Sequence, residues 1–210
     1  MKSTGMLRFE FVWHDFNSPN ITSGKIVFTS KLKKPERFSF LSFYQPATGI
    51  IDEKLPGLLR LVGLPGDTIE IRNGDLYVNN EIADNKFDIT TSFLIPNEQI
   101  KAALSVLKYD TFTRKLFHFP GSVCIELNSN ELKQLKRNRI SVTRYLIGAK
   151  EDNMYLNHRY SKKWSRDQFG PYIIPADSSF LMGDNRHSCI DSRQFGPVAI
   201  SRWKGTVLNP

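Results

Sequence analysis

The sequence predicts a mostly β protein with an antiparallel core and an inserted α+β subdomain. Short segments rich in β-branched and aromatic residues recur at close spacing early in the chain, as in a barrel or sandwich. Thr68–Arg72 alternates apolar and polar residues, and Asn73-Gly74 then predicts a hairpin turn. Helical spacing begins after about residue 85. We therefore assign 1–84 and 167–210 to the β-core and 85–166 to the inserted subdomain.

The strands of the core are predicted from apolar runs that end at turn residues. One of them, Phe38–Tyr44, carries more aromatic surface than one strand face can bury. We expect one face to pack on the core and exposed aromatics of the other to contact lipid; the alternative is that both faces are buried, one under the inserted subdomain. The predicted strands are Phe9–Phe16, Gly24–Thr29, Phe38–Tyr44, Leu58–Val62, Thr68–Arg72, Leu76–Asn79, Gly170–Pro175 and Phe180–Met182.

Two helices are predicted in the inserted subdomain. Asn97–Lys108 carries apolar residues at helical spacing, and Pro96-Asn97 is a start signal. Asn130–Arg137 places Leu132 and Leu135 on one face and basic residues on the other. The segment Asn153–Arg166 is aromatic and basic, and its pattern does not define an element.

The composition is that of an ordinary globular chain. It has 210 residues, 40% hydrophobic and 24% charged, and a net charge of +8, which favours acidic partners. The basic clusters are small and typical of solvated faces, so nucleic acid is an improbable partner. No zinc-ligand spacing or phosphate-binding glycine loop predicts a metal or cofactor. Two cysteines, Cys124 and Cys189, are more typical of free thiols than of a disulfide.

A polar loop lies between apolar segments near the end of the chain, from Phe180 to Val198. If this loop is buried, its charges need partners, because an unpaired buried charge costs several kcal/mol. Asp191 and Arg193 have the chemistry to pair with each other. The alternative is a surface turn held by local hydrogen bonds.

Two ordered motifs carry a family resemblance. Arg60-Leu-Val-Gly-Leu-Pro-Gly-Asp67, followed by Gly74–Asn79, resembles the signature of bacterial type I signal peptidases, and Gly183–Gly196 resembles that family's last motif. The resemblance implies an antiparallel β-core that lies on a membrane and cleaves signal peptides after small residues. It implies an architectural role for these motif residues: Arg60, Gly63, Pro65, Gly66, Asp67, Gly183, Asp184, Asn185, Arg186, Asp191, Ser192 and Arg193.

The resemblance also implies a serine nucleophile and a neutral lysine base. Alignment on Pro19 and Gly24 places Phe16 at the serine position, and alignment on Gly63 places Leu59 at the lysine position. Phenylalanine and leucine cannot perform acyl transfer, so we expect no catalytic residue at either position. A serine of the last motif is replaced by Cys189.

Other side chains could substitute for the dyad in principle. Ser18, Ser23, Lys54, His14 and His187 are the candidates, and exposed or structural roles fit them better. The first hypothesis is therefore a catalytically silent relative that binds an exported precursor peptide, an active signal peptidase paralogue or an anionic membrane surface. The alternatives are an active signal peptidase with a displaced serine and a basic module that binds nucleic acid.

The resemblance conflicts with the sequence over location. It implies the outer face of the cytoplasmic membrane, behind an N-terminal anchor helix. No apolar run approaches the ~20 residues that span a bilayer, and residues 1–16 leave no room for an anchor or a signal peptide. We therefore expect either a fragment of a longer anchored protein or a cytoplasmic one.

Overall fold

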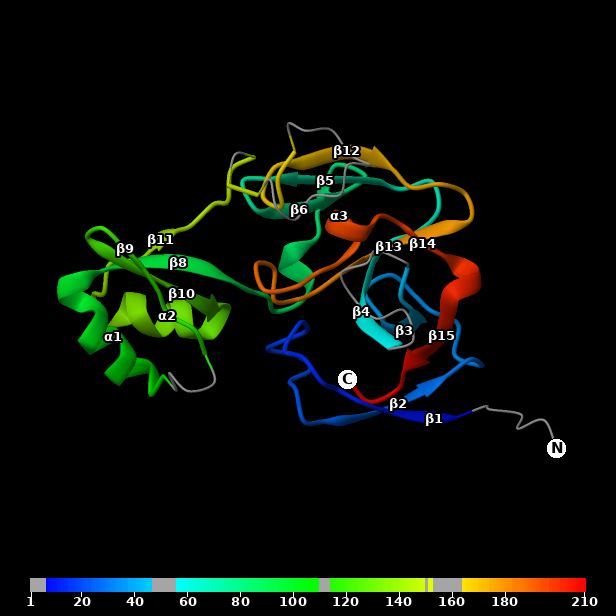
Figure 1. Cartoon of the computed structure of the whole chain (residues 1–210), viewed down its shortest axis with the longest axis horizontal. Coiled ribbons are helices and arrows are strands. Elements are labelled where there is room, and N and C mark those ends of the chain that lie inside the picture. Colours follow the sequence, from blue (N-terminus) through cyan, green and yellow to red (C-terminus); the bar gives the residue numbers. More distant parts are fainter. Residues whose placement is uncertain (1–6, 47–55, 110–113, 150, 153–163) are drawn as a thin grey trace.

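The computed structural model describes residues 7–46, 56–109, 114–149, 151–152 and 164–210. Within them the fold is mostly antiparallel β, as the sequence predicts, and its strands form three sheets (Figure 1). Lys54, one of the candidate substitutes for the dyad, and residues 153–163 of the aromatic and basic segment lie outside the described residues.

The largest sheet has seven strands in the order β1-β2-β15-β3-β4-β13-β14. Strands from the beginning and the end of the sequence pair in this sheet, because β15 lies between β2 and β3. Its strands are β1 (Arg8–Phe11), β2 (Ile26–Ser30), β3 (Phe40–Tyr44), β4 (Pro56–Gly63), β13 (Ser178–Met182), β14 (Val198–Ala199) and β15 (Trp203–Val207).

A second sheet, in the order β12-β5-β6-β7, packs beside the first through a core of Val62, Ile69, Phe169 and Phe180. The predicted hairpin joins β5 to β6, and the φ angles of 51° at Asn73 and 80° at Gly74 suit its tight turn. The strands are β5 (Thr68–Arg72), β6 (Asp75–Val78), β7 (Glu81–Ile82) and β12 (Phe169–Ile173).

The third sheet, β11-β8-β10-β9, is built entirely from residues 90–144 and has its own core with two helices. The predicted helices are present: Asn97 opens a short 3-10 turn before α1, and Asn128 caps α2 in a capping box with Glu131. The elements are β8 (Thr90–Pro96), α1 (Ile100–Leu107), β9 (Phe117–Phe119), β10 (Ser122–Asn128), α2 (Ser129–Arg137) and β11 (Thr143–Arg144). The boundaries 85 and 166 of the inserted subdomain stay a prediction.

Two sequence-based expectations about strands are wrong. The first strand ends at Phe11, not Phe16, because a turn follows in which Asp15 accepts hydrogen bonds from the backbone and hydroxyl of Ser23. The strand Phe40–Tyr44 has no exposed aromatic face: Phe40 to Phe43 are all buried. Phe40 packs with Val12 and Val27 rather than with the inserted subdomain. Only Tyr44, at the strand end, is exposed.

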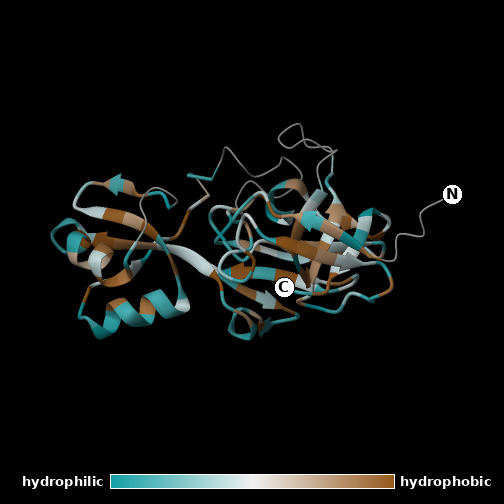
Figure 2. Cartoon of the chain, turned by 90° about the horizontal axis from the view of Figure 1, so that it is seen from below, coloured by the Kyte–Doolittle hydropathy of each residue, from teal (hydrophilic) through white to brown (hydrophobic). Residues whose placement is uncertain are grey.

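Hydrophobic colour concentrates in the strands, while the loops between them are largely hydrophilic (Figure 2). Within the described ranges, no helix has both the length and the apolar composition needed to cross a membrane.

Candidate functional site

Phe16 and Leu59, which the family resemblance predicts to be the dyad positions, lie in one apolar cluster. Leu59 lies on β4 opposite Leu41 and is 2% exposed. Phe16 is half-buried and packs against the same group, which we call the Leu59 cluster. The cluster consists of Leu41, Phe43, Leu59, Leu61, Leu181, Cys189, Phe195 and Val198. These two predicted dyad positions therefore lie among packed apolar side chains.

Cys189 lies in the same cluster, and its thiol is buried there. Burial raises the pKa of its thiol well above the ordinary value, so the thiol stays protonated. Its side chain also fills the space beside Gly183, where an added Cβ would lie 2.4 Å from the Cys189 Sγ. The absence of a side chain at Gly183 therefore lets the motif loop close onto this cluster.

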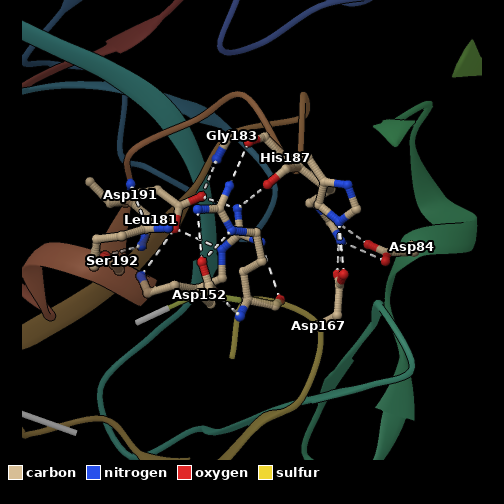
Figure 3. Close-up of polar contacts among 12 residues, drawn as sticks. Asp84, Asp152, Asp167, Leu181, Gly183, His187, Asp191 and Ser192 are labelled. Carbon is tan, nitrogen blue, oxygen red and sulfur yellow. Dashed lines mark hydrogen bonds and ion pairs between the residues drawn. The ribbon is translucent and has the colours of Figure 1, made fainter. Parts of the chain in front are cut away.

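The polar loop is buried, and Asp191 and Arg193 pair inside it (Figure 3). Arg193 Nε donates to Asp191 Oδ1 at 2.9 Å, and Nη2 donates to Oδ2 at 2.8 Å. Asp191 also accepts the backbone N–H groups of Arg193 and Gly183, and so caps the short helix α3 (Ser192–Phe195). The Ser192 hydroxyl accepts the N–H of Leu181 on β13. The alternative of a surface turn is therefore wrong.

A second buried ion pair joins the two motifs. Arg60 Nε and Nη2 donate to the two carboxylate oxygens of Asp184 at 2.7 and 2.6 Å, although 124 residues separate them in the chain. Asn20 donates to the same carboxylate, and the guanidinium carbon of Arg60 lies 4.0 Å from the ring centre of Phe40. The bidentate geometry fixes β4 against the polar loop.

Further carboxylates that the sequence did not predict complete this network. Arg186 pairs with Asp84, Arg166 with Asp152, and His187 Nε2 lies 2.9 Å from Asp167. Burial alone would raise the pKa of Asp167, but the hydrogen bond and charge of His187, the Ile147 N–H and the charge of Arg193 together lower that pKa. The loop contains as many aspartates as arginines, so its sequence did not indicate that Arg186 would pair with the distant Asp84.

Asn185 connects the loop to both neighbouring parts of the molecule. Its backbone N–H donates to the Phe16 carbonyl at 2.9 Å, and its side chain donates to Glu126 on β10 at 3.0 Å. Thr90 and Asn185 also form a parallel bridge at the start of β8. The loop thus contacts the segment that carries Phe16 and the third sheet.

The first motif ends in a turn organised by Asp67. This carboxylate accepts hydrogen bonds from the Leu64 N–H, the Asn79 amide and Arg37. Burial would raise the pKa of Asp67, but these donors, Arg37 first, lower it. Gly66 adopts a φ of 81°, which favours glycine, and Pro65 is exposed beside it.

Among the candidates that the structure describes, His14, Ser18, Ser23 and His187, no serine is hydrogen-bonded to a histidine. His14, Asp15 and Ser18 line a cavity of about 430 Å³ together with Phe16, on which the His14 ring stacks at 4.8 Å. No hydrogen bond joins Ser18 to His14 among the described residues, and Asp15 is bonded to Ser23. His187 is held by Asp167 in the buried network.

The fold and the site define a β protein in which the buried Arg60–Asp184 ion pair holds the first motif, on β4, to the polar loop beside the apolar Leu59 cluster. A family model described as "Signal peptidase, peptidase S26" matches residues 12–209, and the chain belongs to this family.

Among relatives, signal peptidase I of Buchnera aphidicola subsp. Baizongia pistaciae is 29% identical over 190 residues, which cover 84% of this chain and 55% of the relative. Signal peptidase I of Bacillus amyloliquefaciens is 25% identical, with coverage of 64% and 38%. The chain thus spans about half the length, or less, of these relatives. The crystal structure of a signal peptidase I from Enterococcus faecalis V583 matches 84% of this chain and 98% of its own, with 22% identity and a TM-score of 0.39.

Proposed function

We propose that this protein is a catalytically silent member of the signal peptidase family, which acts by binding a partner at a membrane surface. The observation that carries the proposal is the meeting of Phe16 and Leu59 in one apolar cluster. Serine–lysine chemistry needs a hydroxyl and an amine at these two positions. The buried ion pairs around the cluster support the fold without supplying either group.

The alternative is an active signal peptidase with a displaced serine, and the cavity shared by Ser18 and His14 is what favours it. A serine-directed acylating probe, followed by mass spectrometry, separates the two functions. We expect no adduct on Ser18 or Ser23. An adduct on Ser18 that disappears in Ser18→Ala, with the fold unchanged, would favour the enzyme.

A contact with a membrane surface, which the family resemblance would put at the outer face of the cytoplasmic membrane, is supported by an apolar surface on β1 and β2. Phe9 lies opposite Phe28, and Phe11 opposite Ile26, so that the four side chains share one face of the strand pair. All are exposed, Phe9 at 77%, and Trp13 packs on Phe11 with its ring centre 4.6 Å away. A contiguous exposed patch of this kind marks an interaction site, and aromatic residues suit the lipid interface.

Co-sedimentation with vesicles that contain phosphatidylglycerol tests the membrane contact. We expect binding at low salt that falls in a Phe9→Ser/Trp13→Ser variant. Ile173→Ser is the matched control, because Ile173 is 69% exposed but lies on β12 of the second sheet. If the wild-type chain does not pellet with lipid, the membrane contact is refuted. The partner would then be a polypeptide, either an exported precursor or an active paralogue.

A further inference from the structure

The β4 strand has an edge that is only partly paired. On one side it pairs with β3 from Pro56 to Arg60. On the other side it pairs with β13, and there only from Arg60 to Gly63. Residues 56–59 therefore have no strand partner on that second side within the described structure. Such an edge is the usual acceptor for an extended peptide, which adds to a sheet through main-chain hydrogen bonds.

Asn17 lies against this free edge. Its side-chain Nδ2 donates to the Leu58 carbonyl at 2.7 Å, and the residue is 1% exposed. In an antiparallel strand the N–H and C=O of one residue point to the same side. The N–H of Leu58 therefore also points toward this edge. The side chain of Asn17 is an amide like the peptide group, and it makes one of the two hydrogen bonds that a neighbouring strand would make to Leu58.

Little space remains beside this contact. The groove between residues 10–17 and the start of β4 holds a cavity of only about 50 Å³, lined by Trp13, Asn17, Gly57 and Leu58 among others. The Asn17 turn is itself held in place, because the backbone of Asn17 bridges to Ile21 and the carbonyl of Phe16 accepts the Asn185 N–H. A peptide could not approach β4 without displacing the Asn17 side chain.

We infer that Asn17 is an intramolecular plug, which occupies the free edge of β4 and prevents an extended peptide from pairing there. The inference goes beyond the loss of chemistry at Phe16 and Leu59, since a silent protein could keep an open peptide groove. It narrows the choice of partner: an extended polypeptide does not bind by strand addition at β4, and partners bind to other surfaces.

Within the described structure, the Oδ1 atom of Asn17 gains no hydrogen bond from its position at this edge. This atom is buried and has no hydrogen-bond partner among the described residues. An unpaired buried acceptor is unfavourable, so the plug satisfies the edge less completely than a strand would. A shortened side chain at position 17 therefore leaves the Leu58 carbonyl and N–H available to a peptide.

The test measures binding of a fluorescein-labelled, alternating alanine–valine–threonine peptide to three proteins by anisotropy. Wild type is expected to show no saturable binding. Asn17→Ala, which removes the amide, is expected to bind saturably, with a Kd at least tenfold below the highest protein concentration at which wild type shows no binding. Amide exchange at Leu58 should then slow when peptide is present. Asn17→Leu keeps the bulk without the hydrogen bond and is expected to behave as wild type. Asn17→Ser replaces Asn17→Ala if that variant does not fold.

Three results would overturn the inference. Wild type could bind as tightly as Asn17→Ala, which would show an open edge. A folded Asn17→Ala and a folded Asn17→Ser could both fail to bind. Asn17→Leu could bind as well as Asn17→Ala, which would show that occupation of the edge by the side chain is not the barrier. None of these outcomes depends on whether the protein cleaves peptides, so the proposed silence of the dyad is tested separately.

Discussion

Removal of the Asp191 carboxylate is the sharpest test of the buried loop. Asp191 is 0% exposed and Arg193 is 1% exposed. Burial would lower the pKa of Arg193, but Asp191 raises it above its ordinary value, and guanidinium does not lose its proton in proteins. Asp191→Ala therefore leaves a buried cation, together with the N–H groups of Gly183 and Arg193 that Asp191 accepted.

The expected cost is about 3–5 kcal/mol, the range for breaking a buried ion pair by removing one partner. The lower half of that range is favoured, because Arg193 keeps hydrogen bonds to the carbonyls of Arg186 and Arg166. At roughly 2–4 °C per kcal/mol for a chain of this size, Tm should fall by about 6–16 °C. Thermal unfolding followed by circular dichroism measures this shift.

Two comparisons make that experiment specific. Asp191→Ala combined with Arg193→Met removes both charges and should recover part of the loss, because no unpaired cation remains. Glu70→Ala breaks the exposed Glu70–Arg72 pair and should leave Tm almost unchanged. A loss below about 0.5 kcal/mol in Asp191→Ala would refute the reasoning, since it would mean that the pair contributes no more than a surface contact.

Three further predictions concern stability. Leu59→Lys should destabilise the fold at pH 7, because it buries an amine in the Leu59 cluster. Burial lowers the lysine pKa, so the stability of the variant should recover as the pH rises toward ~10.4. A loss of stability that does not change with pH would contradict this. Asp167→Asn should lower the free energy of unfolding at pH 7. The gap in stability between the variant and wild type should shrink as the pH falls below 3.8, because the ionised Asp167 stabilises the fold and becomes protonated at low pH. Urea titrations at several pH values check both. Gly63→Ala should cost about 1–3 kcal/mol, because its Cβ would lie 2.3 Å from Ile174 Cδ1; an unchanged Tm would show that this side chain can move away.

Much of the fold followed from local sequence signals. Thr68–Arg72 and the Asn73-Gly74 turn are where alternation and turn chemistry placed them, because both depend on neighbouring residues. The burial of Phe40 to Phe43 on both faces was only the alternative expectation from the sequence, because it depends on contacts with distant segments, such as those of Phe40 with Val12 and Val27. The exposed aromatic face lies instead on β1 and β2, whose register is set by pairing between distant segments.

The candidate site likewise contains some contacts that the sequence predicted and others that it could not predict. The pairing of Asp191 with Arg193 was predictable from their charges and close spacing, since only Ser192 lies between them. Arg60 and Asp184 were both identified as motif residues, but their pairing was not predicted. The pairing of Asp84 with Arg186 and of Asp167 with His187 could not be predicted from the sequence, because such ion pairs depend on how distant segments pack in the folded protein. The hydrogen bond from Asn17 to Leu58 was equally invisible, since it depends on which edge of β4 stays unpaired.

The central claim, that Phe16 and Leu59 leave this protein without peptidase chemistry, is tested most directly by turnover. The measurement is cleavage of an exported precursor that carries an intact signal peptide, in phosphatidylglycerol vesicles, followed by mass spectrometry of the products. Loss of a nucleophile or base in a serine protease lowers turnover on the order of a million-fold, so the account predicts no cleavage above the protein-free blank. Cleavage by the wild-type chain that is abolished in Ser18→Ala or Ser23→Ala would contradict it.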